Sequence, residues 1–169
     1  MANVKFVNAA SKYQDDTARH DLIHYMTQRR KIPNHIVGFS HGDTAQAADR
    51  MTRTARSFGK DQGVRIYHFI ITFAAGDVRG LEYILYAADE ITRIIGQRHE
   101  IVYAVHEGTR IPHIHFAFNP VSFVDGYKYH GGKEEFKELM EMLRKVMNFV
   151  GVYRFFRVKY VQDGENPHE

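Results

Sequence analysis

The chain has 169 residues, of which 44% are apolar and 25% are charged, a composition typical of a folded domain rather than a disordered segment. It contains no cysteine, which excludes disulfides, thiolate zinc sites and a cysteine nucleophile, so any metal must bind to nitrogen and oxygen. The net charge of +3 and the pI near 9.1 permit an anionic partner. Because no apolar stretch is long enough for a membrane span, we expect a cytoplasmic protein.

The first half of the chain predicts two strands and two helices. Residues 3–8 are typical of a short strand, and apolar residues at helical spacing predict a helix over 16–28. A polar stretch containing a proline follows to about Gly42. A helix over 43–60, for which Asp43 is a plausible N-cap, then precedes residues 64–75, whose β-branched and aromatic side chains predict a buried strand.

The second half predicts two further helices and three strands. Residues 80–97 carry one apolar stripe and form the clearest helix of the chain, and residues 133–150 form a second amphipathic helix. Between them, 100–106 and 111–119 are expected to be two strands joined by a short loop. Residues 152–161 alternate as a last strand.

These elements predict an α+β fold. Tight loops between neighbouring strands, including a hairpin expected at Asp125-Gly126, favour a largely antiparallel sheet of about five strands. We expect the helices mainly on one face, which leaves the other face for a functional site. Residues 1–161 should form a single domain, with 162–169 as a polar tail or the start of a linker to a missing C-terminal region.

A cluster of histidines in "HEGTRIPHIHFAFNP" (residues 106–120) is the most informative feature of the sequence. Because side chains alternate along a strand, His113 and His115 share one face and Ile114 and Phe116 point to the other. If His106 pairs with His113 across a hairpin, all three imidazoles converge, whereas a slip of one residue would move His106 to the opposite face. Such a triad suits a divalent transition ion acting as a Lewis acid.

Two well-known types of histidine metal site match the cluster less well. A site of the metallo-β-lactamase type needs an aspartate two residues beyond the His-x-His pair, and a cupin needs a glutamate a few residues later. The chain has Phe116, Ala117 and Phe118 and then Asn119 and Pro120 at those places. Three unrelated polar residues on a half-exposed sheet remain the simplest alternative.

The segment "HEGTRIPHIHFAFNPVSFVDGYKYHGGK" resembles the third motif and following hairpin of conjugative relaxases, or mobilisation nucleases, of the MOBP type, within the HUH endonuclease superfamily. "KYQDDTARHDLIHYMTQRRK" and "RIYHFIITF" extend the resemblance over nearly the whole chain. It implies a relaxase-like palm that nicks one strand of origin DNA through a tyrosine, leaving a 5′-phosphotyrosine and a free 3′-hydroxyl. It also implies a divalent ion, Mn²⁺ or Mg²⁺, held by His106, His113 and His115, and relaxosome accessory proteins and a coupling protein as partners.

By the same resemblance "DLIHYMTQRRK" makes Tyr25 the catalytic nucleophile, with Tyr13 and His24 as alternatives. Tyr25 could equally belong to the packed stripe of its helix. One departure concerns the acidic residue that many relatives carry two positions after the first histidine. Here that position is Gly108, and Glu107 stands next to it. The missing acid bears on the affinity for the metal and on the rate of nicking more than on the type of reaction.

Cations and aromatic residues suggest how single-stranded DNA would be held, because phosphates bind Arg and Lys and unpaired bases stack on aromatic rings. The candidate DNA-binding residues are Arg29, Arg30, Lys31, Arg53, Lys128 and His130. Two other functions stay open. A replication-initiator nuclease usually has its tyrosine after the histidines, and a non-catalytic nucleic-acid-binding module would bind no stoichiometric metal.

Overall fold

A computed structural model describes residues 2–7, 12–27, 35–74, 76, 79–106, 111–153 and 158–160. Its strands are β1 (Ala2–Phe6), β2 (His35–Phe39), β3 (Tyr67–Phe73), β4 (Ile101–His106), β5 (His113–Phe118) and β6 (Val158–Tyr160). Its helices are α1 (Ala18–Thr27), α2 (Ala47–Ser57), α3 (Leu81–Ile95) and α4 (Lys133–Phe149), with a 3-10 turn η2 (Thr44–Gln46) before α2.

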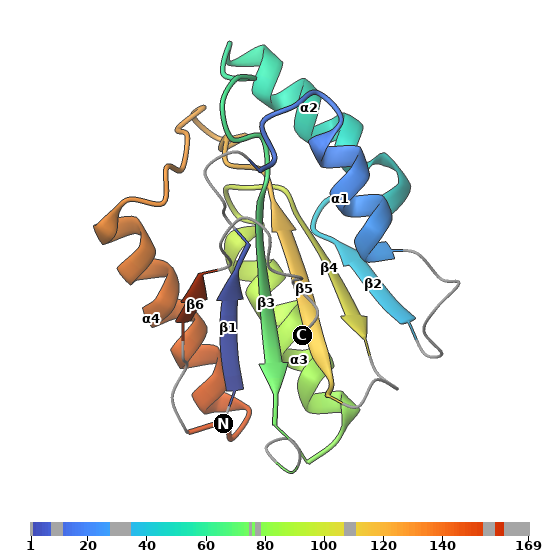
Figure 1. Cartoon of the computed structure of the whole chain (residues 1–169), viewed down its shortest axis with the longest axis vertical. Coiled ribbons are helices and arrows are strands. Elements are labelled where there is room, and N and C mark those ends of the chain that lie inside the picture. Colours follow the sequence, from blue (N-terminus) through green and yellow to red (C-terminus); the bar gives the residue numbers. More distant parts are fainter. Residues whose placement is uncertain are drawn as a thin grey trace.

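The six strands form one sheet in the order β2-β4-β5-β3-β1-β6 (Figure 1). Every neighbouring pair is antiparallel except β1 and β6, which run parallel. The predicted α+β class with a largely antiparallel sheet is therefore confirmed. Strands β4 and β5, which carry the three histidines, lie inside the sheet rather than at its edges.

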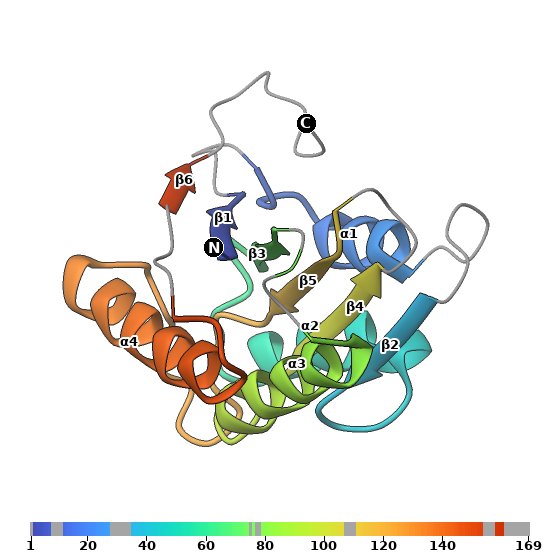
Figure 2. The ribbon, with the colours of Figure 1, turned by 90° about the horizontal axis from the view of Figure 1, so that it is seen from below.

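Helices α3 and α4 cover one face of the sheet (Figure 2). Alternate residues of the central strands, among them Tyr103, Ile114 and Phe116, point into this main core. The rings of Phe116 and Phe69 stack there with centroids 4.8 Å apart. The predicted alternation of β5, with Ile114 and Phe116 on the core side, is thus confirmed.

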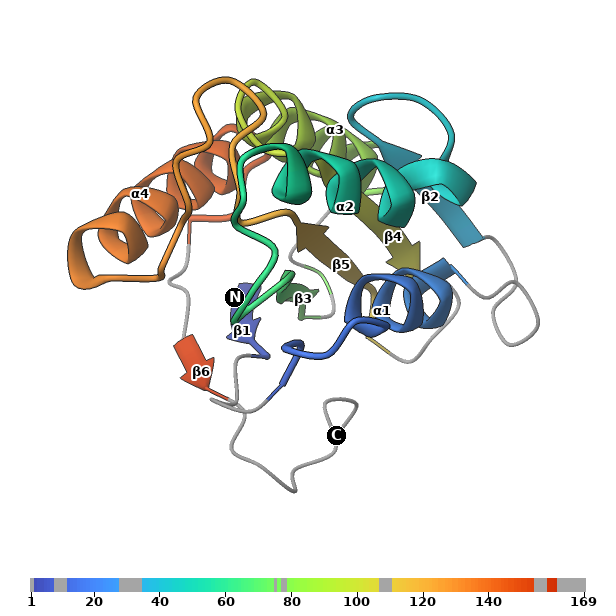
Figure 3. The ribbon, with the colours of Figure 1, turned by 90° about the horizontal axis from the view of Figure 1, so that it is seen from above.

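On the opposite face α1 packs against the sheet, and α2 lies beside α1 across one end of the strands (Figure 3). Their buried side chains contact Val102, Ala104 and Ala117. Small residues on this face let the helices approach the strands closely. The helices do not lie mainly on one face as predicted, because the small side chains of the histidine face allow α1, the helix of Tyr25, to pack on it and cover part of it.

Strand β2 is not predicted by the sequence, because residues 35–39 follow a polar stretch and have neither a long apolar run nor clear alternation. Pairing with β4 stabilises this edge strand, and a close contact explains its glycine. A Cβ atom added at Gly38 would lie 2.3 Å from Cε1 of Tyr103, so only glycine lets this ring lie against the strand.

The hairpin expected around Asp125-Gly126 is a turn rather than a pair of strands. A single bridge joins Val121 and Lys128, and the backbone N–H of Ser122 donates to the carbonyl of Tyr127 over 2.8 Å. The side chain of Asp125 accepts the N–H of Tyr127, so local hydrogen bonds close the loop before a ladder can extend.

Some of the predicted residues lie outside the described part of the chain, namely Arg29, Arg30, Lys31, Glu107, Gly108 and the tail 162–169. Of the strand predicted over 152–161, Val158–Tyr160 is confirmed as β6. Among the described residues, no helix combines the length and the apolar character that crossing a membrane requires.

Candidate metal centre

The three histidines of the sequence cluster converge at one end of β4 and β5. His106 lies directly opposite His113 in the antiparallel pair, and His115 lies opposite Ala104. One candidate ligand atom from each of the three imidazoles lies within 4.8 Å of the other two. The predicted register and convergence are confirmed, and both His106 and His115 are buried.

Hydrogen bonds determine which nitrogen carries the proton in two of the rings. Nε2 of His106 lies 3.1 Å from the carbonyl oxygen of Met26, and Nδ1 of His113 lies 2.9 Å from that of Ile111. A carbonyl only accepts, so each of these nitrogens must be the N–H donor. In the neutral rings the lone pairs then sit on Nδ1 of His106 and Nε2 of His113.

These two lone-pair nitrogens lie 3.2 Å apart and face the same space. Two acceptors at this distance repel each other unless a cation or a proton lies between them. Burial lowers the pKa of His113 and so favours its neutral form. The donor set therefore fits a divalent ion bound by imidazole nitrogen, with the outer nitrogens held by backbone carbonyls as in known histidine metal sites.

The third ring, His115, is held by another histidine. Its Nδ1 lies 3.0 Å from Nε2 of His68, so Nε2 is the nitrogen of His115 that would bind a metal. His68 is buried on β3, and burial lowers its pKa to about 3, so the ring is neutral. The sequence predicted no role for His68. The sequence feature that could have identified it is a single histidine within a strand that is otherwise almost entirely apolar.

Of the three candidate nucleophiles, Tyr25 has the position that suits attack at the triad. Its ring centroid is 6.1 Å from that of His115, and the side chain is 42% exposed. The neighbouring carbonyl of Met26 accepts from His106, which ties this end of α1 to the metal centre. Tyr25 therefore combines closeness to the triad with access from solvent.

The alternatives fit a nucleophile less well. The hydroxyl of Tyr13 lies 3.1 Å from Nδ1 of His68, and burial raises its pKa to about 12, which opposes formation of a phenolate. His24 is exposed on α1, beside Tyr25 in the sequence. The contact between the rings of Tyr25 and His115 therefore favours Tyr25.

The described candidates for DNA binding lie away from the triad. Lys128 and His130 follow the end of β5 opposite to His113 in the chain. Nζ of Lys128 donates to the carbonyls of Gln62 and Lys60. Burial lowers the pKa of Lys128. Arg53 is exposed on α2, and His130 is exposed before α4. The structure therefore does not bring these three residues together with the metal centre.

Asn119, which shares a face with His113 in the alternating pattern, belongs to a different buried group. Its Nδ2 donates to the carbonyl of Met51 and to the carboxylate of Glu100, at 3.1 and 2.8 Å. Both partners are buried. Asn119 thus joins α2 to the sheet and takes no part in the histidine triad.

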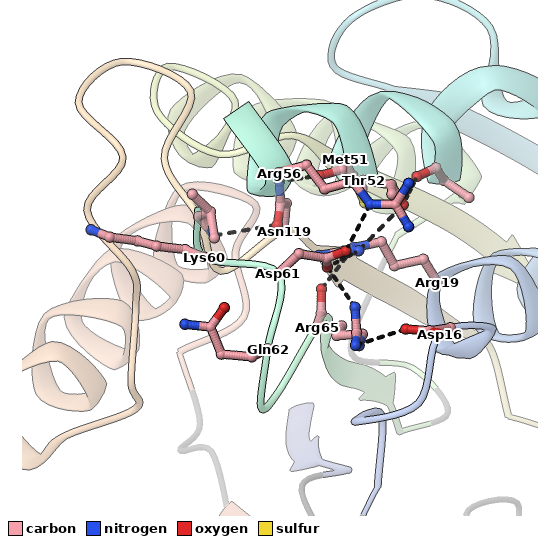
Figure 4. Close-up of polar contacts among 12 residues, drawn as sticks. Asp16, Arg19, Met51, Thr52, Arg56, Lys60, Asp61, Gln62, Arg65 and Asn119 are labelled. Atoms are coloured by element: carbon pink, nitrogen blue, oxygen red, sulfur yellow. Dashed lines mark hydrogen bonds and ion pairs between the residues drawn. The ribbon is translucent and has the colours of Figure 1, made fainter. Parts of the chain in front are cut away.

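The helix of Tyr25 is anchored by a buried arginine (Figure 4). Arg19, at the start of α1, is 2% exposed, and its Nη1 lies 2.8 Å from Oδ1 of Asp61. Arg65 approaches the same oxygen at 2.7 Å, and the carbonyl of Arg65 accepts from Nε of Arg19. These contacts join α1 to the segment that leads into β3.

A family model described as "Relaxase: MobA/VirD2-like, nuclease domain" matches residues 23–151 of the chain. The matched range contains Tyr25 and all three histidines. It runs from the last half of α1 to the end of α4. No curated protein gives a significant match to the sequence.

Proposed function

We propose that this chain, which belongs to the relaxase family with a MobA/VirD2-like nuclease domain, nicks one strand of DNA at a transfer origin. The reaction would use Tyr25 and a divalent metal ion. The observation that carries the proposal is the convergence of His106, His113 and His115 beside the exposed ring of Tyr25. A nucleophile next to a Lewis-acid site is an arrangement that suits phosphoryl transfer.

The residues that would hold the ion, Mn²⁺ or Mg²⁺, are His106, His113 and His115. When bound, such an ion supplies a positive charge that polarises the scissile phosphate. The protein contributes rigidity, because two rings are held by backbone carbonyls and the third by His68. Three neutral imidazoles add no negative charge to the site, which favours the approach of a phosphate.

Tyr25 would perform the covalent step. Its hydroxyl oxygen attacks phosphorus and loses its proton, the bond from phosphorus to the 3′-oxygen breaks, and that oxygen leaves as a 3′-hydroxyl after taking up a proton. The product is a 5′-phosphotyrosine. Attack by a 3′-hydroxyl on the same phosphorus reverses the step and releases the phenol, so the strand is religated without an external energy source.

The wider function follows from this chemistry. Nicking and religation of one strand at an origin serve conjugative transfer or mobilisation of a plasmid or integrative element in the cytoplasm. Accessory proteins of the relaxosome and a coupling protein are the partners we propose. Arg53, Lys128 and His130 are proposed to contact DNA remote from the scissile phosphate, and Arg29, Arg30 and Lys31 to contact backbone phosphates next to the nucleophile.

The test is a nicking assay with labelled single-stranded oligonucleotides tiled across the DNA that flanks the coding sequence of the chain, with and without Mn²⁺ or Mg²⁺. The double variant His113→Ala/His115→Ala should lose nicking and keep its fold. Unchanged nicking would show that the triad is not the metal centre.

The nucleophile is tested separately by the covalent adduct. Tyr25→Phe should abolish the protein–DNA adduct seen on a denaturing gel. Tyr86→Phe is the matched control, since Tyr86 lies on α3 at nearly the same exposure of 43% and remote from the histidines. An adduct that persists in Tyr25→Phe would move the nucleophile to Tyr13 or His24.

The same experiments distinguish the two competing functions. A replication initiator of the same superfamily is disfavoured by the position of Tyr25 before the histidines in the chain, and it would cut a replication origin instead. A non-catalytic binding module would bind oligonucleotides but form no adduct and no stoichiometric metal complex.

A further inference from the structure

A chain of two hydrogen bonds leads away from the metal centre into the protein. Nδ1 of His115 lies 3.0 Å from Nε2 of His68, and Nδ1 of His68 lies 3.1 Å from the hydroxyl of Tyr13. The rings of His68 and His115 are also stacked, with centroids 5.2 Å apart and an angle of 17° between their planes. Neither His68 nor Tyr13 is a metal ligand or the proposed nucleophile.

We propose that His68 and Tyr13 are positioning residues that hold His115 in the tautomer that binds the metal. This inference rests on the proposed metal site. In most histidine metal centres the outer N–H of a ligand is held by a carboxylate, a carbonyl or a water. Here a neutral imidazole takes that place for His115, and a phenol in turn holds the imidazole.

The heavy-atom positions fit two arrangements of protons. In the first, Tyr13 donates to His68, His68 donates from Nε2 to His115, and His115 carries its own proton on Nε2, where it blocks a metal. In the second, His115 donates from Nδ1 to His68, and His68 donates from Nδ1 to the oxygen of Tyr13. The second arrangement leaves the Nε2 lone pair of His115 for the ion.

The sheet places His68 beside a small residue and diagonally across from His115. His68 lies directly opposite Ala117 in the β3–β5 pair, and His115 is the diagonal neighbour on the same face. A methyl group at position 117 leaves space for the ring of His68 to lean over it toward His115. The buried position of His68 keeps water from competing for either nitrogen.

Tyr13 is held in an unusual backbone conformation to reach His68. Among the described residues it is the non-glycine residue with a positive φ, 63°. The N–H of Arg65 donates to its carbonyl over 2.8 Å and stabilises this conformation. Left-handed backbone is unfavourable for a tyrosine, and such strain is commonly retained where a side chain must be aimed at a functional group.

The experiment measures the Mn²⁺ dissociation constant of the 169-residue chain by isothermal titration calorimetry. The variants are Tyr13→Phe, His68→Phe and their combination. His99→Phe is the matched control, because His99 is a partly buried histidine that is also bonded through Nδ1, but to the carbonyl of Asn119. Thermal unfolding without metal monitors the fold of each variant.

We expect His68→Phe to weaken Mn²⁺ binding by about 10- to 100-fold, and Tyr13→Phe by about two- to tenfold through the loss of one hydrogen bond. Since Tyr13 acts through His68, the double variant should bind no more weakly than His68→Phe alone. His99→Phe should bind like the wild type. A purely structural role would instead lower the unfolding temperature of His68→Phe and leave its Mn²⁺ affinity unchanged.

Three results would overturn the inference. The first is wild-type Mn²⁺ affinity in a folded His68→Phe variant. The second is a double variant in which the losses of Mn²⁺ affinity caused by the two single substitutions multiply. The third, if His68→Phe does not fold, is wild-type Mn²⁺ affinity in Tyr13→Phe. A wild-type chain that binds no stoichiometric Mn²⁺ would instead contradict the proposed metal site. The two failures are therefore distinguishable.

Discussion

Replacing Asp61 with asparagine should destabilise the protein strongly, because Asp61 neutralises the buried guanidinium that anchors α1. Arg19 is 2% exposed and lies 2.8 Å from Asp61. Asparagine keeps the shape of the side chain and removes its charge. The remaining bonds of Arg19, to the hydroxyl of Thr52 and the carbonyl of Arg65, are to neutral acceptors.

The expected loss follows from the burial of the pair. Removing one partner of a buried ion pair typically costs about 3–5 kcal/mol, because the other charge is left uncompensated. For a chain of this length that corresponds to a fall in unfolding temperature of roughly 6–20 °C. The control is Arg56→Ala. Arg56 is 68% exposed and contacts the same carboxylate at 3.1 Å, so its removal should cost only about 0–1 kcal/mol.

The cost should also depend on pH. Burial alone would raise the pKa of Asp61, but hydrogen bonds and charge from Arg19, with those of Arg56 and Arg65, outweigh it and hold the pKa below its usual value. The ionised carboxylate therefore contributes its stability above the ordinary pKa of about 3.9 and loses it as the pH falls toward the folded-state value. Wild type and Asp61→Asn should converge below about pH 4.

Urea unfolding followed by circular dichroism, at pH 7 and at stepwise lower pH, measures these differences. Two results would contradict the expected role of Asp61. In one, Asp61→Asn unfolds within about 1 kcal/mol of Arg56→Ala at pH 7, and in the other its difference from the wild type does not shrink on acidification. Either result would mean that the charge of Arg19 is compensated without Asp61.

Metal binding and sheet packing give two further predictions. Mn²⁺ at 100 times its dissociation constant should stabilise the folded chain by about 2.7 kcal/mol, seen as a rise in unfolding temperature that His113→Ala abolishes. A rise that persists in that variant would place the ion elsewhere. Gly38→Ala should cost about 1–3 kcal/mol, because its Cβ would lie 2.3 Å from the ring of Tyr103. Gly132→Ala, where the nearest atom is the end of the flexible Glu135 side chain at 3.4 Å, should cost about 0.5 kcal/mol or less. Equal losses in a denaturant titration would show that the close contact at Gly38 is relieved without cost.

Features that depend on local periodicity could be predicted from the amino-acid sequence. Alternation along β5 placed His113 and His115 on one face and Ile114 and Phe116 on the other, and helical spacing located all four helices to within a few residues. These patterns are local because the backbone geometry of a strand or helix decides which neighbours share a face. The motif around Tyr25 could likewise be recognised without any structure.

Contacts between residues of distant segments could be identified only in the folded structure. The register between β3 and β5 brings His68 to His115. The turn at Tyr13 then adds the second hydrogen bond, from the Tyr13 hydroxyl to His68, although the two residues are 55 positions apart in the sequence. Edge strand β2 forms because β4 offers it a partner, and its own sequence is too short and too weakly patterned to predict it. Local alternation could suggest the His106–His113 register of neighbouring strands, but it does not determine which distant strands become neighbours, because that depends on the packing of the whole sheet.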